Sequence, residues 1–192
     1  PLLNRSNSAE PAESSAPAES PPQGTSSPTV AAGDPTAATD DGVPLAEALA
    51  QFQSEVADVR SGFENVKQRV QACAESPTAE VIEDCVADLK NVGQRILERR
   101  ADAIDILQDS SDGSAAQQQA IDEVQQASAR QAADIRETLE EITQLELNPE
   151  SLEQDCQQLQ DHTETLVASC DGVSESIETA KSQVEAEAAK SH

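Results

Sequence analysis

The chain has 192 residues, with 37 acidic and 12 basic side chains and a formal net charge of -25. Such a surface repels nucleic-acid phosphates and anionic membranes, so neither is an expected partner. The negative charge indicates either a cation-rich protein partner or simply a surface that keeps a long helical chain soluble. The sequence has no apolar run of 18 residues, which predicts that it has no transmembrane helix.

Residues 1–43 are predicted to form a disordered tail. Seven of the ten prolines lie there among Ser, Thr, Ala and Glu, and this composition buries too little apolar surface to offset the entropy of ordering. Asn4, followed by Arg5 and Ser6, is a candidate N-glycosylation site in a secreted protein. The chain starts at Pro1 rather than at methionine, as expected for a mature secreted protein whose signal peptide has been removed.

The pattern changes after residue 43 to apolar residues spaced alternately by four and three positions. This heptad spacing predicts helices that pack side by side at small crossing angles. The helices are expected at about 44–74, 78–108, 114–147 and 149–188. Their apolar stripes run from Leu45 to Cys73, from Ile82 through Ile96, Arg99 and Ala103 to Ile106, from Ile121 to Leu145, and from Leu152 to Val184.

Turn residues separate the four helical stretches. Ser76-Pro77 and Asn148-Pro149 each offer an N-cap followed by proline at a first helical position, and residues 109–113 form a polar turn cluster. Because short connections make successive helices antiparallel, we expect an all-α fold, an antiparallel four-helix bundle behind the tail. The alternative is a helical hairpin that dimerises through the same stripes.

The four cysteines are predicted to form disulfides in an oxidising, extracellular compartment. Their spacing lacks the short C-x-x-C element of zinc sites, and three of them are expected at one end of the bundle. The favoured pairing is Cys73 with Cys85 and Cys156 with Cys170. The second bond requires a break in the fourth helix near residues 161–165, because 14 helical residues span about 21 Å. Otherwise Cys170 stays free or links two chains.

One layer of small residues is expected inside the bundle. Gly62, Gly93 and Ala132 fall at about the same height when counted from the turns. Glycine costs about 1 kcal/mol relative to alanine in a helix, so its presence calls for a reason. The layer is either a narrow waist with a polar, register-fixing neighbourhood or an internal site for a small apolar ligand.

No residue set predicts catalysis, a metal or a cofactor. Di-iron bundles need Glu-x-x-His on two helices, whereas His162 is the one histidine within the predicted helices, and Leu159 precedes it by three positions. The chain also has no EF-hand spacing and no glycine-rich phosphate loop. We therefore expect a protein that is not an enzyme.

Three functions fit these features. The first is a secreted, acidic interaction module that binds an extracellular protein partner. The second follows from a resemblance: in its Ala-, Gln- and Glu-rich helices with few aromatic residues, the segment 44–190 is similar to the exchangeable apolipoproteins, which implies an amphipathic lipid or small-ligand carrier. The stripes are narrower than the broad apolar faces that lipid binding favours. The third is a self-assembling coiled-coil structural protein, a homo-oligomer built through the stripes.

Overall fold

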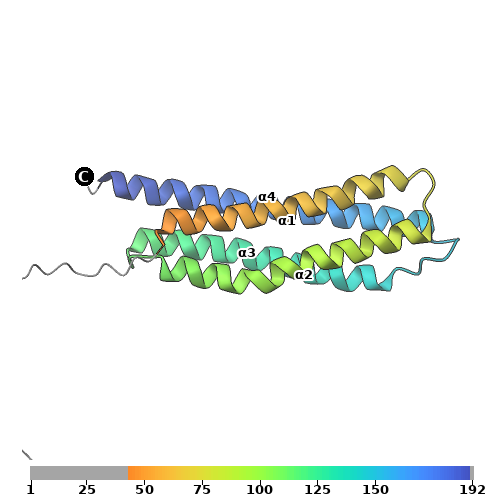
Figure 1. Ribbon diagram of the computed structural model, residues 1–192, viewed down its shortest axis with the longest axis horizontal. Coiled ribbons are helices and arrows are strands. Elements are labelled where there is room, and N and C mark those ends of the chain that lie inside the picture. The colour runs from red at the N-terminus through yellow and green to blue at the C-terminus, as the bar shows by residue number, and fades with distance from the viewer. Residues whose placement is uncertain (1–42, 191–192) are drawn as a thin grey trace, which may run out of the picture. The chain divides into compact units, whose positions relative to one another are not determined.

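The computed structural model describes residues 43–190 and confirms the antiparallel four-helix bundle (Figure 1). Within this range the chain forms helices and turns and no strand. The helices are α1 (Leu45–Cys73), α2 (Ala79–Asp109), α3 (Ala115–Glu141) and α4 (Leu152–Lys190), with the short 3₁₀ turn η1 (Ile142–Gln144) after α3. The predicted tail, except Val43, lies outside the described residues, as does Asn4.

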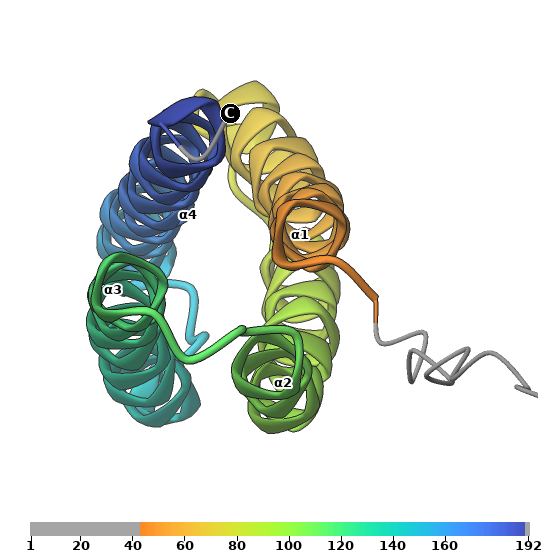
Figure 2. The ribbon, with the colours of Figure 1, turned by 90° about the vertical axis from the view of Figure 1, so that its left-hand side faces the viewer.

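The four helices follow one another around the bundle axis, so that α4 closes the ring against α1 (Figure 2). The α1–α4 and α3–α4 pairs pack most extensively, and α2–α3 is the sparsest of the four neighbouring pairs. The α2–α4 diagonal contributes little. Helix α2 is therefore held mainly through its partner α1.

The core is built from the predicted stripes and is almost entirely aliphatic. In α1 the last position of the predicted stripe, Cys73, is half-buried, and the other heptad positions are buried: Leu45, Leu49, Phe52, Val56, Val59, Phe63, Val66 and Val70. Burying each large apolar side chain stabilises the fold by roughly 1.5–3 kcal/mol relative to leaving it exposed. The described helices thus derive their stability from length and from many such contacts.

The predicted stripe of α2 is correct at Ala103 but wrong at Arg99 and Ile106. Ile106, predicted to face the core, is 41% exposed, whereas Leu107 is fully buried. The buried face continues from Ile96 past Arg100 to Ala103 and Leu107. A straight helix has 3.6 residues per turn, so a strict 3.5-residue repeat drifts around it, and the sequence offers two phases here. The observed phase turns Arg99 and Ile106 away from the core.

Three polar side chains are buried among the aliphatic core residues. Ser128 is fully buried, and its Oγ accepts a hydrogen bond from Arg100 Nε at 2.7 Å. Gln131, also buried, donates from Nε2 to Cys170 Sγ at 3.2 Å, and Thr163 Oγ1 donates to the Gln160 carbonyl oxygen at 2.8 Å. No buried side-chain nitrogen or oxygen in the described residues lacks a partner. These buried polar side chains are therefore satisfied by partners within the protein.

Two of the predicted helix boundaries need correction. Helix α3 ends at Glu141 rather than near residue 147, and α4 begins at Leu152 rather than at 149. Proline disfavours the helical conformation in the residue before it, which keeps Asn148 out of the helix. Instead Leu147 has a φ of +52°, and its amide donates to Asp155 Oδ2 at 3.0 Å.

The caps also differ slightly from the prediction. The N-cap of α2 is Thr78, whose Oγ1 accepts from the Val81 amide at 3.4 Å, and not Ser76. Ser114 caps α3 as its spacing from Gln117 predicted, with Oγ accepting from the Gln117 amide at 3.3 Å. These side chains satisfy amides that the first helical turn leaves without a carbonyl partner.

Candidate functional site

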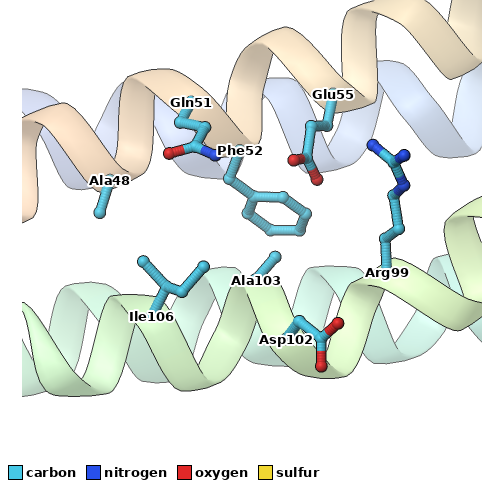
Figure 3. A pocket seen from close by; sticks show the side chains of 8 residues that line it. All are labelled: Ala48, Gln51, Phe52, Glu55, Arg99, Asp102, Ala103 and Ile106. Atoms are coloured by element: carbon cyan, nitrogen blue, oxygen red, sulfur yellow. The ribbon is translucent and has the colours of Figure 1, made fainter.

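A hollow of mixed apolar and charged character lies between α1 and α2, near the start of α1 and the end of α2. It has a volume of about 210 Å³. Eight residues line it: Ala48, Gln51, Phe52, Glu55, Arg99, Asp102, Ala103 and Ile106 (Figure 3). We call this hollow the α1–α2 groove, and this end of the bundle the groove end.

The floor of the groove is apolar. Phe52 is only 2% exposed and reaches from α1 into the space between the two helices (Figure 3). Ala48 and Ala103 are buried beside it, and Ile106 forms an exposed rim. Val43 and Ile106 are the large apolar residues that stand out as exposed in the described part of the chain, and both lie at this end.

The charged rim of the groove has unused hydrogen-bonding capacity. Arg99 points from α2 toward α1, where Glu55 faces it (Figure 3). No ion pair or hydrogen bond within the described residues joins Arg99 to Glu55 or to Asp102. A smaller hollow of about 90 Å³ continues along the same seam, shares Glu55 and Arg99, and adds Arg95. A guanidinium has five N–H donors, so this rim is ready to receive acceptors from another molecule.

Basic residues on the α1–α4 side are used differently. Arg60 Nε lies 2.5 Å from Asp171 Oδ1, and this hydrogen bond raises the pKa of the guanidinium. Lys67 Nζ lies 3.7 Å from Glu164 Oε1 on α4. Such exposed pairs are screened by solvent and add little to stability, so packing of the apolar stripes holds these helices together.

The small-residue layer is closely packed at its two glycines. A Cβ built on Gly62 would meet Val92 Cγ2 at 3.0 Å, and one built on Gly93 would meet Ile135 Cγ2 at 3.0 Å. Ala132 is 2% exposed. The glycines allow α1, α2 and α3 to approach closely, which favours the narrow waist over the internal ligand site for these residues.

The structure gathers three of the four cysteines at the end of the bundle opposite the groove. The Sγ atoms of Cys73 and Cys156 lie 3.8 Å apart. Cys85 is buried and close enough for its charge to raise the pKa of Cys156. We call this the cysteine end. All four cysteines, including Cys170, are free thiols in the structure.

The predicted break in the fourth helix is wrong, because α4 runs without interruption from Leu152 to Lys190. Cys156 and Cys170 therefore sit about 21 Å apart along one helix and cannot pair with each other. Cys170 is also fully buried, so it is not available to link two chains. Burial raises the pKa of its thiol to about 11.

The described residues offer no grouping of three or more His, Cys, Asp or Glu side chains suited to a metal ion. His162 Nε2 lies 3.4 Å from Glu141 Oε2, and this contact joins α4 to the end of α3. Nor is any helix between residues 43 and 190 long and apolar enough to cross a membrane.

Comparison with known proteins adds no relative: the chain matches no family model, and neither the curated proteins nor the solved structures give a match.

The sequence reasoning missed the groove because it placed Arg99 and Ile106 on the core stripe. The spacing carried no deciding signal: the alternative phase through Arg100 and Leu107 keeps the same four-and-three spacing and buries Leu107 in place of Ile106. Whether Arg99 or Arg100 faces the core depends on the neighbouring helix α3, where Ser128 accepts a hydrogen bond from Arg100.

Proposed function

We propose that this chain is an extracellular, non-enzymatic interaction module that binds a helical segment of a protein partner in the α1–α2 groove. The observation that carries the proposal is the groove itself: an apolar floor over Phe52, with Arg99 on its rim and without an ion-pair partner among the described residues. Grooves between two helices accept amphipathic helices through one row of apolar anchors.

The lining residues define the chemistry of the partner segment. One large apolar side chain would enter between Phe52 and Ile106. A neighbouring carboxylate would accept hydrogen bonds from Arg99, and such charge-assisted bonds are roughly twice as strong as neutral ones. A basic residue would lie beside Glu55 and Asp102, and the net charge of -25 would speed the encounter with a cationic partner.

Two features support an interaction module over the lipid carrier. The apolar stripes of all four helices are turned into the core, and exposed large apolar side chains in the described range are confined to Val43 and Ile106. Lipid binding would therefore require the bundle to open. The extracellular location rests on the even number of cysteines, two of which approach each other closely.

An affinity capture with charge-matched variants tests the proposal. The full chain, Ile106→Glu and Ala168→Glu are each incubated with the extracellular fluid of the source, and bound proteins and lipids are both analysed. Ala168 is exposed on α4, so it adds the same charge far from the groove.

We expect one stoichiometric protein with the wild type and with Ala168→Glu, and its loss with Ile106→Glu. Equal capture by both variants would contradict the groove as the binding site. Enrichment of lipid without protein would favour the carrier, and recovery of only the chain itself would favour self-assembly.

A further inference from the structure

Two thiols converge at the cysteine end from different helices. Cys73 is the last residue of α1, and Cys156 begins the second turn of α4. Their Sγ atoms are 3.8 Å apart. Both also contact the Val70 carbonyl oxygen, at 3.2 Å from Cys73 Sγ and 3.7 Å from Cys156 Sγ. The two side chains therefore point at one spot between α1 and α4.

We propose that Cys73 and Cys156 are a disulfide-forming pair that joins the end of α1 covalently to the start of α4. A disulfide has an S–S distance of about 2.05 Å, so the sulfurs need to approach by about 1.8 Å. Cys73 borders the turn at residues 74–78, and a terminal helical turn adjusts more readily than an interior one. The required movement is thus local.

The other thiols fit this bond less well. Cys85 is fully buried inside α2 and makes no hydrogen-bonding contact within the described residues. Cys170 lies 14 residues beyond Cys156 on the same helix and accepts its hydrogen bond from Gln131. Cys73 is the one cysteine with part of its surface exposed, so it is the entry point for an oxidant.

The chemistry is a thiol–disulfide exchange with a small-molecule disulfide, for which oxidised glutathione serves as the probe. The Cys73 thiolate attacks one sulfur of the oxidant and releases one glutathione thiolate. The Cys156 thiolate then attacks the Cys73 sulfur of the mixed disulfide and releases the second. The two protons and two electrons of the cysteines end on two molecules of reduced glutathione. Burial and the neighbouring Cys73 raise the pKa of Cys156 to about 11, which makes the second step the slower one.

The bond would close a loop between residues 83 positions apart, which contains α2 and α3. Cross-links over loops of this length restrict the unfolded chain strongly, and a rise in Tm of roughly 10 °C is expected on oxidation. The inference does not depend on the groove or on its partner.

Peptide mapping of the full chain tests the pairing. The reduced protein is equilibrated with oxidised glutathione, free thiols are blocked with iodoacetamide, and the chain is cut by a glutamate-specific protease. Cleavage after the glutamates separates all four cysteines, into residues 65–75, 84–98, 154–164 and 165–175. Trypsin would leave Cys73 and Cys85 in one fragment.

We expect residues 65–75 linked to 154–164, together with the rise in Tm and its reversal by a reductant. Cys85→Ala should keep both the link and the rise, and Cys156→Ala should abolish both. A link from 65–75 to 84–98, glutathione retained on Cys73 without a second step, or four blocked thiols after oxidation would each overturn the proposal.

Discussion

At the cysteine end, the α3–α4 connection folds back over the core with Leu145 and Leu147, and both pack against it. At the groove end, the α2–α3 connection consists of Ser110, Ser111, Asp112, Gly113 and Ser114, which bring no apolar side chain to the core. The same heptad pattern thus meets an apolar cover at one end and a polar turn at the other.

The difference shows how connections decide where a uniform bundle stays open. The polar turn makes hydrogen bonds within itself: the Ser114 amide donates to Asp112 Oδ1 at 2.9 Å, and Gly113 takes a φ of +79°. Such a turn ends α2 without covering it. The phase change past Arg100 then leaves Ile106 and Arg99 on the outer seam with α1, where the groove forms.

The largest expected effect tests that phase change with two adjacent residues. Leu107→Ala removes a fully buried side chain and should lower the free energy of unfolding by about 2–5 kcal/mol. Ile106→Ala removes an exposed one and should stay within about 1 kcal/mol. Urea unfolding of both variants measures the contrast, and equal or reversed costs would restore the predicted stripe through Ile106.

Rates of thiol alkylation can be compared between the partly exposed Cys73 and the fully buried Cys170. Because burial raises the pKa of Cys170 to about 11, roughly one thousandth of this thiol is ionised at pH 8. In the reduced chain Cys170 should be alkylated about 100-fold more slowly than an unperturbed thiol, and about tenfold faster for each pH unit of increase. Iodoacetamide labelling followed by peptide mapping gives the rates; labelling of Cys170 as fast as Cys73 would mean that the core opens.

The same raised pKa has a consequence for stability. Below about pH 9 the Cys170 thiol is protonated in both the folded and the unfolded chain, and its stabilising contribution is complete. Between about pH 9 and 11 the unfolded chain loses the proton first, so stability should fall by about 2 kcal/mol as the pH rises. Unfolding of wild type and Cys170→Ala at pH 8 and 10.5 measures this, and identical pH dependence would show that another group is responsible.

A charge reversal at the groove should act on binding rather than on folding. Arg99→Glu is expected to weaken binding of the captured partner at least about tenfold, since it replaces hydrogen-bond donors with a repelling carboxylate. Its free energy of unfolding should change by less than about 0.5 kcal/mol. Arg130→Glu, an exposed residue on α3, is the matched control. Titration with the partner measures the affinity of each variant. An equal loss of affinity in Arg99→Glu and Arg130→Glu would indicate a general effect of charge.

The smallest effect concerns the waist between the two ends. A Cβ built on Gly172 would meet nothing within 4 Å, so Gly172→Ala should stabilise the chain by about 1 kcal/mol through helix propensity. Gly93→Ala gains the same propensity but presses on Ile135, and should be about 1–2 kcal/mol less stable than Gly172→Ala. Thermal unfolding compares them, and equal gains would mean that the waist has spare room.

The fold was largely predictable from the sequence, because four heptad stripes separated by proline and polar turns leave few other arrangements. The buried state of Ser128, Gln131 and Thr163 also followed from their stripe positions. The phase of α2 near Arg99 did not, because two registers satisfy the same spacing and only the facing helix distinguishes them.

Which cysteine sulfurs lie close together also could not be predicted from the sequence. The sequence placed Cys73, Cys85 and Cys156 near one end, but which sulfurs meet depends on how helices rotate about their axes. The continuity of α4 also could not be inferred from the weak helix propensity of residues 161–165. Packing overrides such preferences: Thr163 is fully buried there.

The most direct test of binding in the groove is to place a photo-crosslinking amino acid at Ile106 and, in a second protein, at Ala168, and to map what each one captures in extracellular fluid. We expect a cross-link from position 106 to one apolar, charge-flanked helical segment of one protein, displaced by excess unlabelled chain and absent from position 168. Cross-links to the same protein from both positions, or none from position 106, would contradict the groove as the place where this chain binds.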